Sequence, residues 1–100
     1  MKQYLNQFHK AFENRIRLGI MSALMANDYV EFNAFKDLLE VTDGNLASHL
    51  KALEKEKFIE MNKTFVGRKP NTRYRATEIG KRAFEKHLAA LEELIKEQLK

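Results

Sequence analysis

Residues 64–84 read TFVGRKPNTRYRATEIGKRAF, and this stretch decides which fold the chain can adopt. The GRKPN segment of residues 67–71 combines glycine, proline and asparagine, which favour a tight turn. Before it, Ile59, Met61 and Phe65 alternate with polar residues, with Lys63 as the exception on the apolar side, and after it Thr72 to Ala76 alternate with arginines. Two alternating runs joined by a five-residue Gly/Pro/Asn loop predict a β-hairpin over about residues 58–76.

This hairpin is more basic than a turn requires. Residues 57–86 hold nine lysines and arginines against three glutamates, a local charge of +6. Since the whole chain carries +4, the remaining residues carry −2. A basic stripe on a near-neutral body is typical of a protein that binds a polyanion such as nucleic acid. The alternative interpretation is a solvated surface whose charge is merely uneven.

The sequence before the hairpin predicts two helices joined by a short connection. The first begins near Asn33, and the second follows Thr42, a good N-cap residue. One face of the second helix carries an apolar stripe, Leu46, Leu50 and Leu53. Such a pair is a helix-turn-helix over about residues 33–56, whose second helix can enter the major groove of DNA. A hairpin that follows directly is the wing of a winged helix.

Both ends of the chain are expected to be helical. Apolar spacing predicts helix over residues 3–26, and Thr77 caps a long helix over residues 77–99. That last helix would be about 30 Å long, more than a domain with a radius of gyration of about 13 Å can cover. Part of its apolar seam is therefore expected to meet a second copy of the chain, the alternative being that it packs wholly on its own domain. The expected interface residues are Tyr4, Leu5, Phe8, Phe12, Phe84, Leu88, Leu91 and Ile95.

These elements predict a single domain over residues 1–100. It is mainly α with a small β-hairpin wing, in the order α-(β)-α-α-β-β-α. The fold class is thus a winged helix-turn-helix with a long C-terminal dimerisation helix, and no internal repeat or linker divides it.

Candidate DNA-contacting side chains lie on the second helix and on the hairpin. Asn45 and His49 are one turn apart, and asparagine can pair bidentately with adenine while histidine can reach bases or phosphates. Arginine on the hairpin suits phosphates and a narrow minor groove because of its planar donor fork. The expected contacts are Thr42, Asn45, Ser48, His49, Lys51, Lys63, Arg68, Lys69, Arg73 and Arg75. For each helix residue the alternative is a solvated surface.

The segment VTDGNLASHLKALEKEKFIEMNKTFVGRKPNTRYRATEIGKRAF, residues 41–84, resembles the winged-helix transcriptional regulators of the MarR and ArsR groups. It is most similar to small stand-alone winged-helix DNA-binding proteins with a TDGNL helix, a GRKP wing and a C-terminal dimerisation helix. Lys57 and Phe58 stand where that family often has Gly-Tyr, and Ala76 where it often has leucine. The resemblance implies DNA contacts by Thr42, Asn45, Ser48 and His49.

Other function classes find no support in the composition. Without cysteine the chain has no disulfide framework, thiolate metal site or thiol nucleophile. The three histidines, His9, His49 and His87, are scattered and form no recognisable catalytic arrangement. We therefore expect no enzymatic activity, no cofactor and no metal, while a small-molecule effector is left open. With no apolar run near the roughly 18 residues of a membrane span and no secretory signal, the expected location is the cytoplasm.

The sequence thus predicts a homodimeric transcriptional regulator that binds double-stranded DNA. The recognition helix, residues 42–56, would enter the major groove, and the basic wing would meet phosphates or the minor groove. Two-fold symmetry would place two such helices about one helical turn apart on a pseudo-palindromic operator. The alternative is a winged-helix module for protein or RNA interaction without specific DNA binding.

Overall fold

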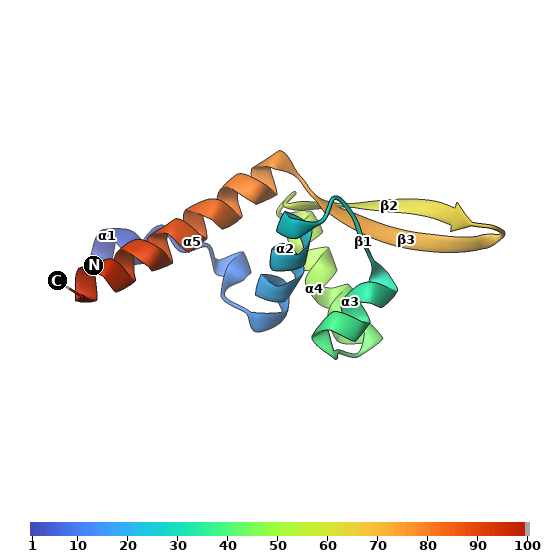
Figure 1. Ribbon diagram of the computed structural model, residues 1–100, viewed down its shortest axis with the longest axis horizontal. Helices are drawn as coiled ribbons and strands as arrows, with labels where there is room; N and C mark the ends of the chain where they lie inside the picture. Colours follow the sequence, from blue (N-terminus) through green and yellow to red (C-terminus); the bar gives the residue numbers. More distant parts are fainter. Residues whose placement is uncertain (100) are drawn as a thin grey trace.

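A computed structural model describes residues 1–99 of the chain (Figure 1). Its elements are α1 (Lys2–Leu5), the 3-10 helix η1 (Lys10–Phe12), α2 (Arg15–Ala26), β1 (Val30–Glu31), α3 (Phe32–Leu39), α4 (Asp43–Lys55), β2 (Ile59–Val66), β3 (Lys69–Ala76) and α5 (Glu78–Gln98). The strands form one antiparallel sheet in the order β1-β3-β2. The winged helix-turn-helix expected from the sequence is confirmed, with its long C-terminal helix.

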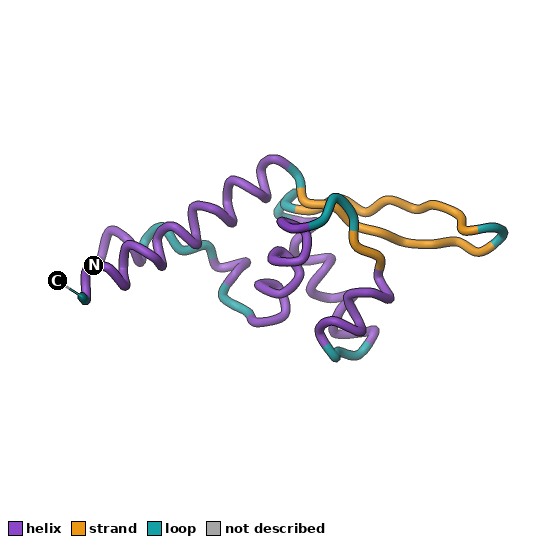
Figure 2. Tube along the Cα trace, viewed as in Figure 1, coloured by secondary structure: helices purple, strands orange, loops and turns teal. Residues whose placement is uncertain are grey.

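The wing and α5 project from the helical body in opposite directions (Figures 1 and 2). Together they give the molecule its longest extent, 57 Å against 26 and 21 Å. The chain's N-terminal segment lies along the far half of α5, where the terminal ammonium pairs with Glu97 at 2.8 Å. In the part of the chain that is described, no helix is both long enough and apolar enough to cross a membrane.

The N-terminal region is not one helix over residues 3–26, as its apolar spacing suggested. α1 ends at Leu5, η1 starts after His9, and α2 starts only after Asn14. The His9 and Asn14 side chains each accept a hydrogen bond from a backbone N–H of the helix that follows. Because each cap starts a new helix, the direction of the apolar side chains changes at these points and a single 3.6-residue period does not describe them.

The monomer core contains two aromatic residues that were expected at a dimer interface. Phe12 is 0% exposed and Phe84 is 2% exposed. Their rings meet edge to face with centroids 5.2 Å apart, and Phe12 also stacks on Phe58 at 5.2 Å. A fully buried side chain can touch only its own chain. Phe12 and Phe84 therefore belong to the core of the monomer, and their expected place at a dimer interface is wrong.

α4 ends in a Schellman motif from which the wing starts. Lys57 has a left-handed φ of +63°, and its N–H donates to the Glu54 carbonyl at 2.8 Å. The N–H of Phe58 donates to the Leu53 carbonyl at 3.0 Å. Thr77, the N-cap of α5, donates its hydroxyl to the Lys57 carbonyl at 2.7 Å and its N–H to the Phe58 carbonyl at 3.0 Å. These bonds set the direction in which the wing leaves the recognition helix.

The turn at the wing tip is shorter than the expected five-residue loop. β2 runs to Val66 and β3 begins at Lys69, so that only Gly67 and Arg68 form the turn. Gly67 has a φ of +66°, as the first position of a two-residue type II′ turn requires. Pro70 lacks an N–H, but β3 can accommodate it. β1 pairs with β3 only at Arg73 and Tyr74, so near Pro70 the edge of β3 opposite β2 has no partner strand.

Candidate nucleic-acid interface

α4 exposes a polar face beside its buried leucines. The leucine stripe, Leu46, Leu50 and Leu53, is at most 1% exposed and anchors the helix in the core. The residues expected to contact DNA lie outside it: Thr42, Asn45, Ser48 and Lys51 are exposed and His49 is half-buried. The Thr42 oxygen accepts a hydrogen bond from the Asn45 N–H at 3.2 Å, so that Thr42 also caps the helix.

The start of α4 is tied to α3 by an ion pair. Lys36 Nζ lies 2.7 Å from Asp43 Oδ1, and the hydrogen bond to this carboxylate raises the pKa of Lys36. Asp43 is the first residue of α4, where a negative charge is favourable at the positive end of the helix dipole. This largely exposed pair therefore links the first turn of α4 to α3, while the buried leucines of α4 hold the helix in the core.

His49 is held by an arginine that sequence reasoning missed. Arg17 Nη1, on α2, lies 3.0 Å from His49 Nδ1 and must be the donor, because a guanidinium has no acceptor. Burial, and then the charge of Arg17, lower the pKa of His49. The imidazole is thus neutral near pH 7, with Nε2–H as its remaining donor. The two residues are 32 positions apart, so no local pattern could have linked them.

The arginines at the base of the wing have partners within the chain. Arg73 lies over the Tyr29 ring, 3.7 Å from its centroid, and donates Nε–H to Asn62 Oδ1 at 3.0 Å. Arg75 Nε lies 3.1 Å from Glu60 Oε2. A DNA contact by either arginine would have to compete with these internal partners, which the alternation of the sequence did not reveal.

The cations farther along the wing are free of such pairs. Arg68 and Lys69 at the tip are exposed, as is Lys63 on β2. Within residues 1–99 none of these three takes part in an ion pair. The positive charge that the wing offers to a polyanion is therefore concentrated toward its tip.

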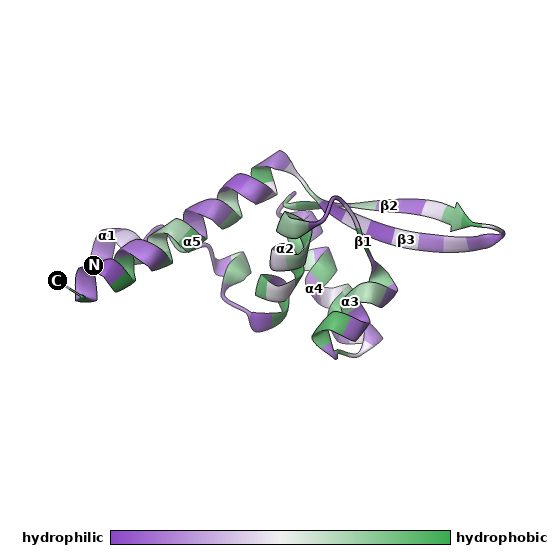
Figure 3. Cartoon of the chain, in the orientation of Figure 1, coloured by the Kyte–Doolittle hydropathy of each residue, from purple (hydrophilic) through white to green (hydrophobic). Residues whose placement is uncertain are grey.

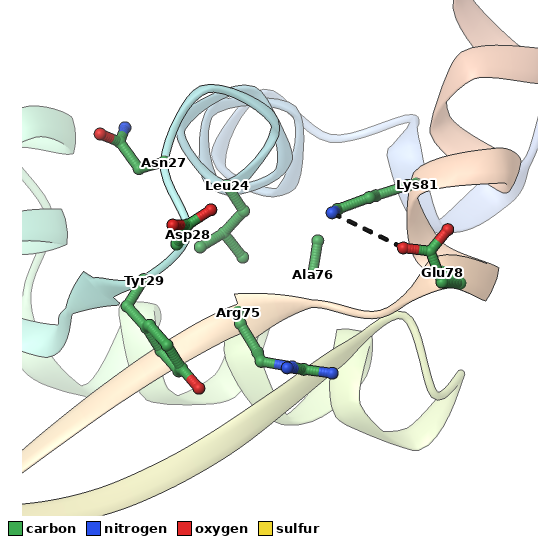
Figure 4. A pocket seen from close by; sticks show the side chains of 8 residues that line it. All are labelled: Leu24, Asn27, Asp28, Tyr29, Arg75, Ala76, Glu78 and Lys81. Atoms are coloured by element: carbon green, nitrogen blue, oxygen red, sulfur yellow. Dashed lines mark ion pairs between the residues drawn. The ribbon is translucent and has the colours of Figure 1, made fainter.

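A polar hollow of about 240 Å³ lies at the base of the wing, between the end of α2 and the start of α5 (Figure 4). Arg75 and Tyr29 lie on one side of it, and Lys81 and Glu78, 3.8 Å apart, lie on the other. Its lining thus carries both signs of charge. Across the residues described, no group of three or more His, Cys, Asp or Glu side chains could hold a metal ion.

α5 carries an exposed apolar stripe away from the wing. Phe84, His87 and Ala90 are buried, whereas the stripe consists of Leu88 (44% exposed), Leu91 (42%), Ile95 (52%) and Leu99 (80%). Leu88, Leu91 and Ile95 were expected at a dimer interface, and Leu99 extends the stripe they form by another helical turn.

The expected interface residues of the N-terminal segment differ from one another. Leu5 is 48% exposed, whereas Tyr4 and Phe8 are half-buried. The Phe8 ring lies against that of His87 with centroids 5.0 Å apart. The segment therefore covers one side of α5 and leaves the stripe of Leu88, Leu91, Ile95 and Leu99 open.

Comparison with known proteins bears on this arrangement. Residues 16–95 match the model of the winged helix DNA-binding domain family. The uncharacterized protein MJ0432 of Methanocaldococcus jannaschii is 36% identical over 87 residues, which cover 87% of this chain and 95% of that protein. The transcriptional regulator homologue from Pyrococcus horikoshii OT3 superposes with a TM-score of 0.87 at 28% identity, over 96% of this chain and 97% of that one. A protein assigned to the MarR family, from Enterococcus faecalis V583, shares the fold with a TM-score of 0.68 at 17% identity, over 97% of this chain and 86% of that one.

Proposed function

Because this chain belongs to the winged helix DNA-binding domain family, we propose that it is a homodimeric transcriptional regulator that binds specific sequences of double-stranded DNA. One observation carries the proposal: the exposed polar face of α4 and the unpaired cations of the wing belong to elements joined rigidly through Lys57, Phe58 and Thr77. These bonds fix the wing relative to α4, and on this proposal a duplex meets both at once, with α4 in the major groove and the wing on phosphates or the minor groove.

The roles of the side chains follow from their donors and charges. Asn45 and Ser48 read base edges, and the Nε2–H of His49 donates to a base or phosphate acceptor. Lys51 on the helix, together with the wing cations Lys63, Arg68 and Lys69, binds phosphates. Arg73 and Arg75 are left out of this contact set because of their internal partners. The protein acts by binding rather than by catalysis.

The dimer forms through α5. The stripe of Leu88, Leu91, Ile95 and Leu99 repeats at intervals of three and four residues, which suits helix packing across a two-fold axis. Leu5 of the N-terminal segment is also exposed and takes part in the same proposed interface. On this proposal residues 1–100 form one domain, with its helix-turn-helix over 33–56 and its wing over 58–76. The dimer binds a pseudo-palindromic operator in the cytoplasm.

The test is selection of bound duplexes from a random pool, with the oligomeric state measured by sedimentation in parallel. We expect an enriched inverted repeat whose half-sites lie about 10 base pairs apart and a dimer in solution. Asn45→Ala is the matched variant: it should relax base preference in each half-site while retaining non-specific binding at low salt. A protein that shifts no duplex at low salt would instead be a module for protein or RNA contacts.

A further inference from the structure

The wing carries a large apolar side chain in an unusual place. Phe65 is 73% exposed, although it lies only one residue before the end of β2 and near the charged tip. Figure 3 shows the end of β2 as a hydrophobic segment on a largely hydrophilic ribbon. The core of the helical body does not cover this side chain, because this part of the wing lies beyond the body (Figure 1).

Strand register decides which way Phe65 faces. Met61 pairs with Tyr74 and Phe65 with Pro70, so all four side chains lie on the same face of the ribbon. Tyr74 is buried and its ring lies 6.3 Å from that of Phe35 on α3. Phe65 therefore belongs to the wing face that looks toward the helix-turn-helix. A hollow of about 390 Å³ separates this face from the start of α3.

The reach of the wing matches the spacing of DNA grooves. Met61 pairs with the buried Tyr74, near the helical body. From Met61 to Val66, the end of β2, the strand advances five residues, about 17 Å at roughly 3.3 Å per residue. Half a turn of B-DNA is also about 17 Å. With α4 in the major groove, the wing tip thus reaches the neighbouring minor groove.

The charges around Phe65 identify the kind of partner. Lys63 lies on the same face, and Arg68 and Lys69 follow at the turn. An apolar side chain surrounded by unpaired cations suits a surface that has phosphates at its edges and flat apolar groups inside. The minor groove of DNA has phosphates along its edges, and it offers the apolar faces of its bases to a side chain that unstacks a base step.

We infer that Phe65 enters the minor groove and wedges between base pairs at a flexible pyrimidine–purine step, while Arg68 and Lys69 hold the flanking phosphates. The inference rests on the proposed DNA binding and adds to it a contact that reads deformability instead of base edges. It predicts a sequence preference outside the bases that α4 touches.

The first experiment uses the absence of tryptophan from the chain. Phe65→Trp supplies a single indole, whose fluorescence is followed as an operator duplex from the selection is added. We expect stacking on bases to quench the emission and to protect the indole from acrylamide. An indole as accessible in the complex as in the free protein overturns the inference.

The second experiment compares neighbouring residues on opposite faces. Phe65→Ala should weaken binding about tenfold or more, since stacking of one base on an aromatic ring contributes that much, and should leave the salt dependence unchanged. Val66→Ala is the matched control, because Val66 is 66% exposed but points to the other face; it should bind like wild type. If the Phe65→Ala and Val66→Ala proteins bind with equal affinity, the insertion of Phe65 is overturned while the proposed DNA binding stands. A wild-type protein that binds no duplex overturns the proposed function, and the wedge with it.

Discussion

The sharpest prediction concerns the two cations at the wing tip. Arg68→Ala with Lys69→Ala removes side chains that are exposed and have no ion-pair partner among residues 1–99. Each phosphate that a cation neutralises contributes about −0.9 to the slope of log K against log salt. If both residues contact phosphates in both protomers of a dimer, the slope should become less steep by about 3.6.

A slope difference of that size is easily measured. Between about 50 and 200 mM salt, wild-type affinity should fall roughly a hundredfold more than the affinity of the double variant. Fluorescence anisotropy with a labelled operator, at four or five salt concentrations, gives both slopes. A random duplex should show the same change, since phosphate contacts carry no base information.

Two controls separate tip contacts from charge in general. Arg82→Ala with Lys86→Ala removes the same charge from α5, away from the wing, and should leave the slope close to wild type. Arg75→Ala removes a wing cation that is already paired with Glu60, so it should leave the slope close to wild type instead of flattening it by the roughly 0.9 per protomer of a lost phosphate contact. If the tip variant has the wild-type slope, or the α5 variant flattens it equally, the assignment of the wing tip to phosphates is refuted.

Three further predictions test the fold and the dimer. Lys57→Gly should raise the free energy of unfolding by about 0.5–1 kcal/mol in urea titrations, because the left-handed φ of +63° disfavours a residue with a side chain. The control Glu56→Gly, at an ordinary φ of −77°, should not raise the free energy of unfolding. Burial lowers the pKa of His87 in the folded state, so the unfolded chain takes up a proton on this residue more readily. The free energy of unfolding should therefore fall as the pH drops through about 6.5, the pKa of an unfolded histidine, and it should fall less in His87→Gln. Leu91→Glu should raise the dimer dissociation constant in sedimentation at least about a hundredfold, whereas Ala89→Glu on another face of α5 should leave it unchanged.

The sequence alone determined the recognition helix and the wing because their signals are local. Thr42 caps α4 as expected, its leucines are buried as their spacing predicted, and Gly67 turns the hairpin. The resemblance to winged-helix regulators, drawn from residues 41–84, is confirmed by the family match over residues 16–95. Each of these features depends on residues a few positions apart, within which helix and strand periods hold.

Tertiary structure alone decided what each face meets. Helical periodicity placed Phe12 and Phe84 on apolar faces of their helices. Only the packing of two segments that lie 72 positions apart in the sequence brings their rings together in the core. Alternation placed Arg73 on a polar face but could not show that Tyr29 would lie beneath it, nor that Arg17 would hold His49. A local pattern specifies the direction of a side chain relative to its own element. The partner in that direction comes from a distant part of the chain, and its position is set by the packing of the whole core.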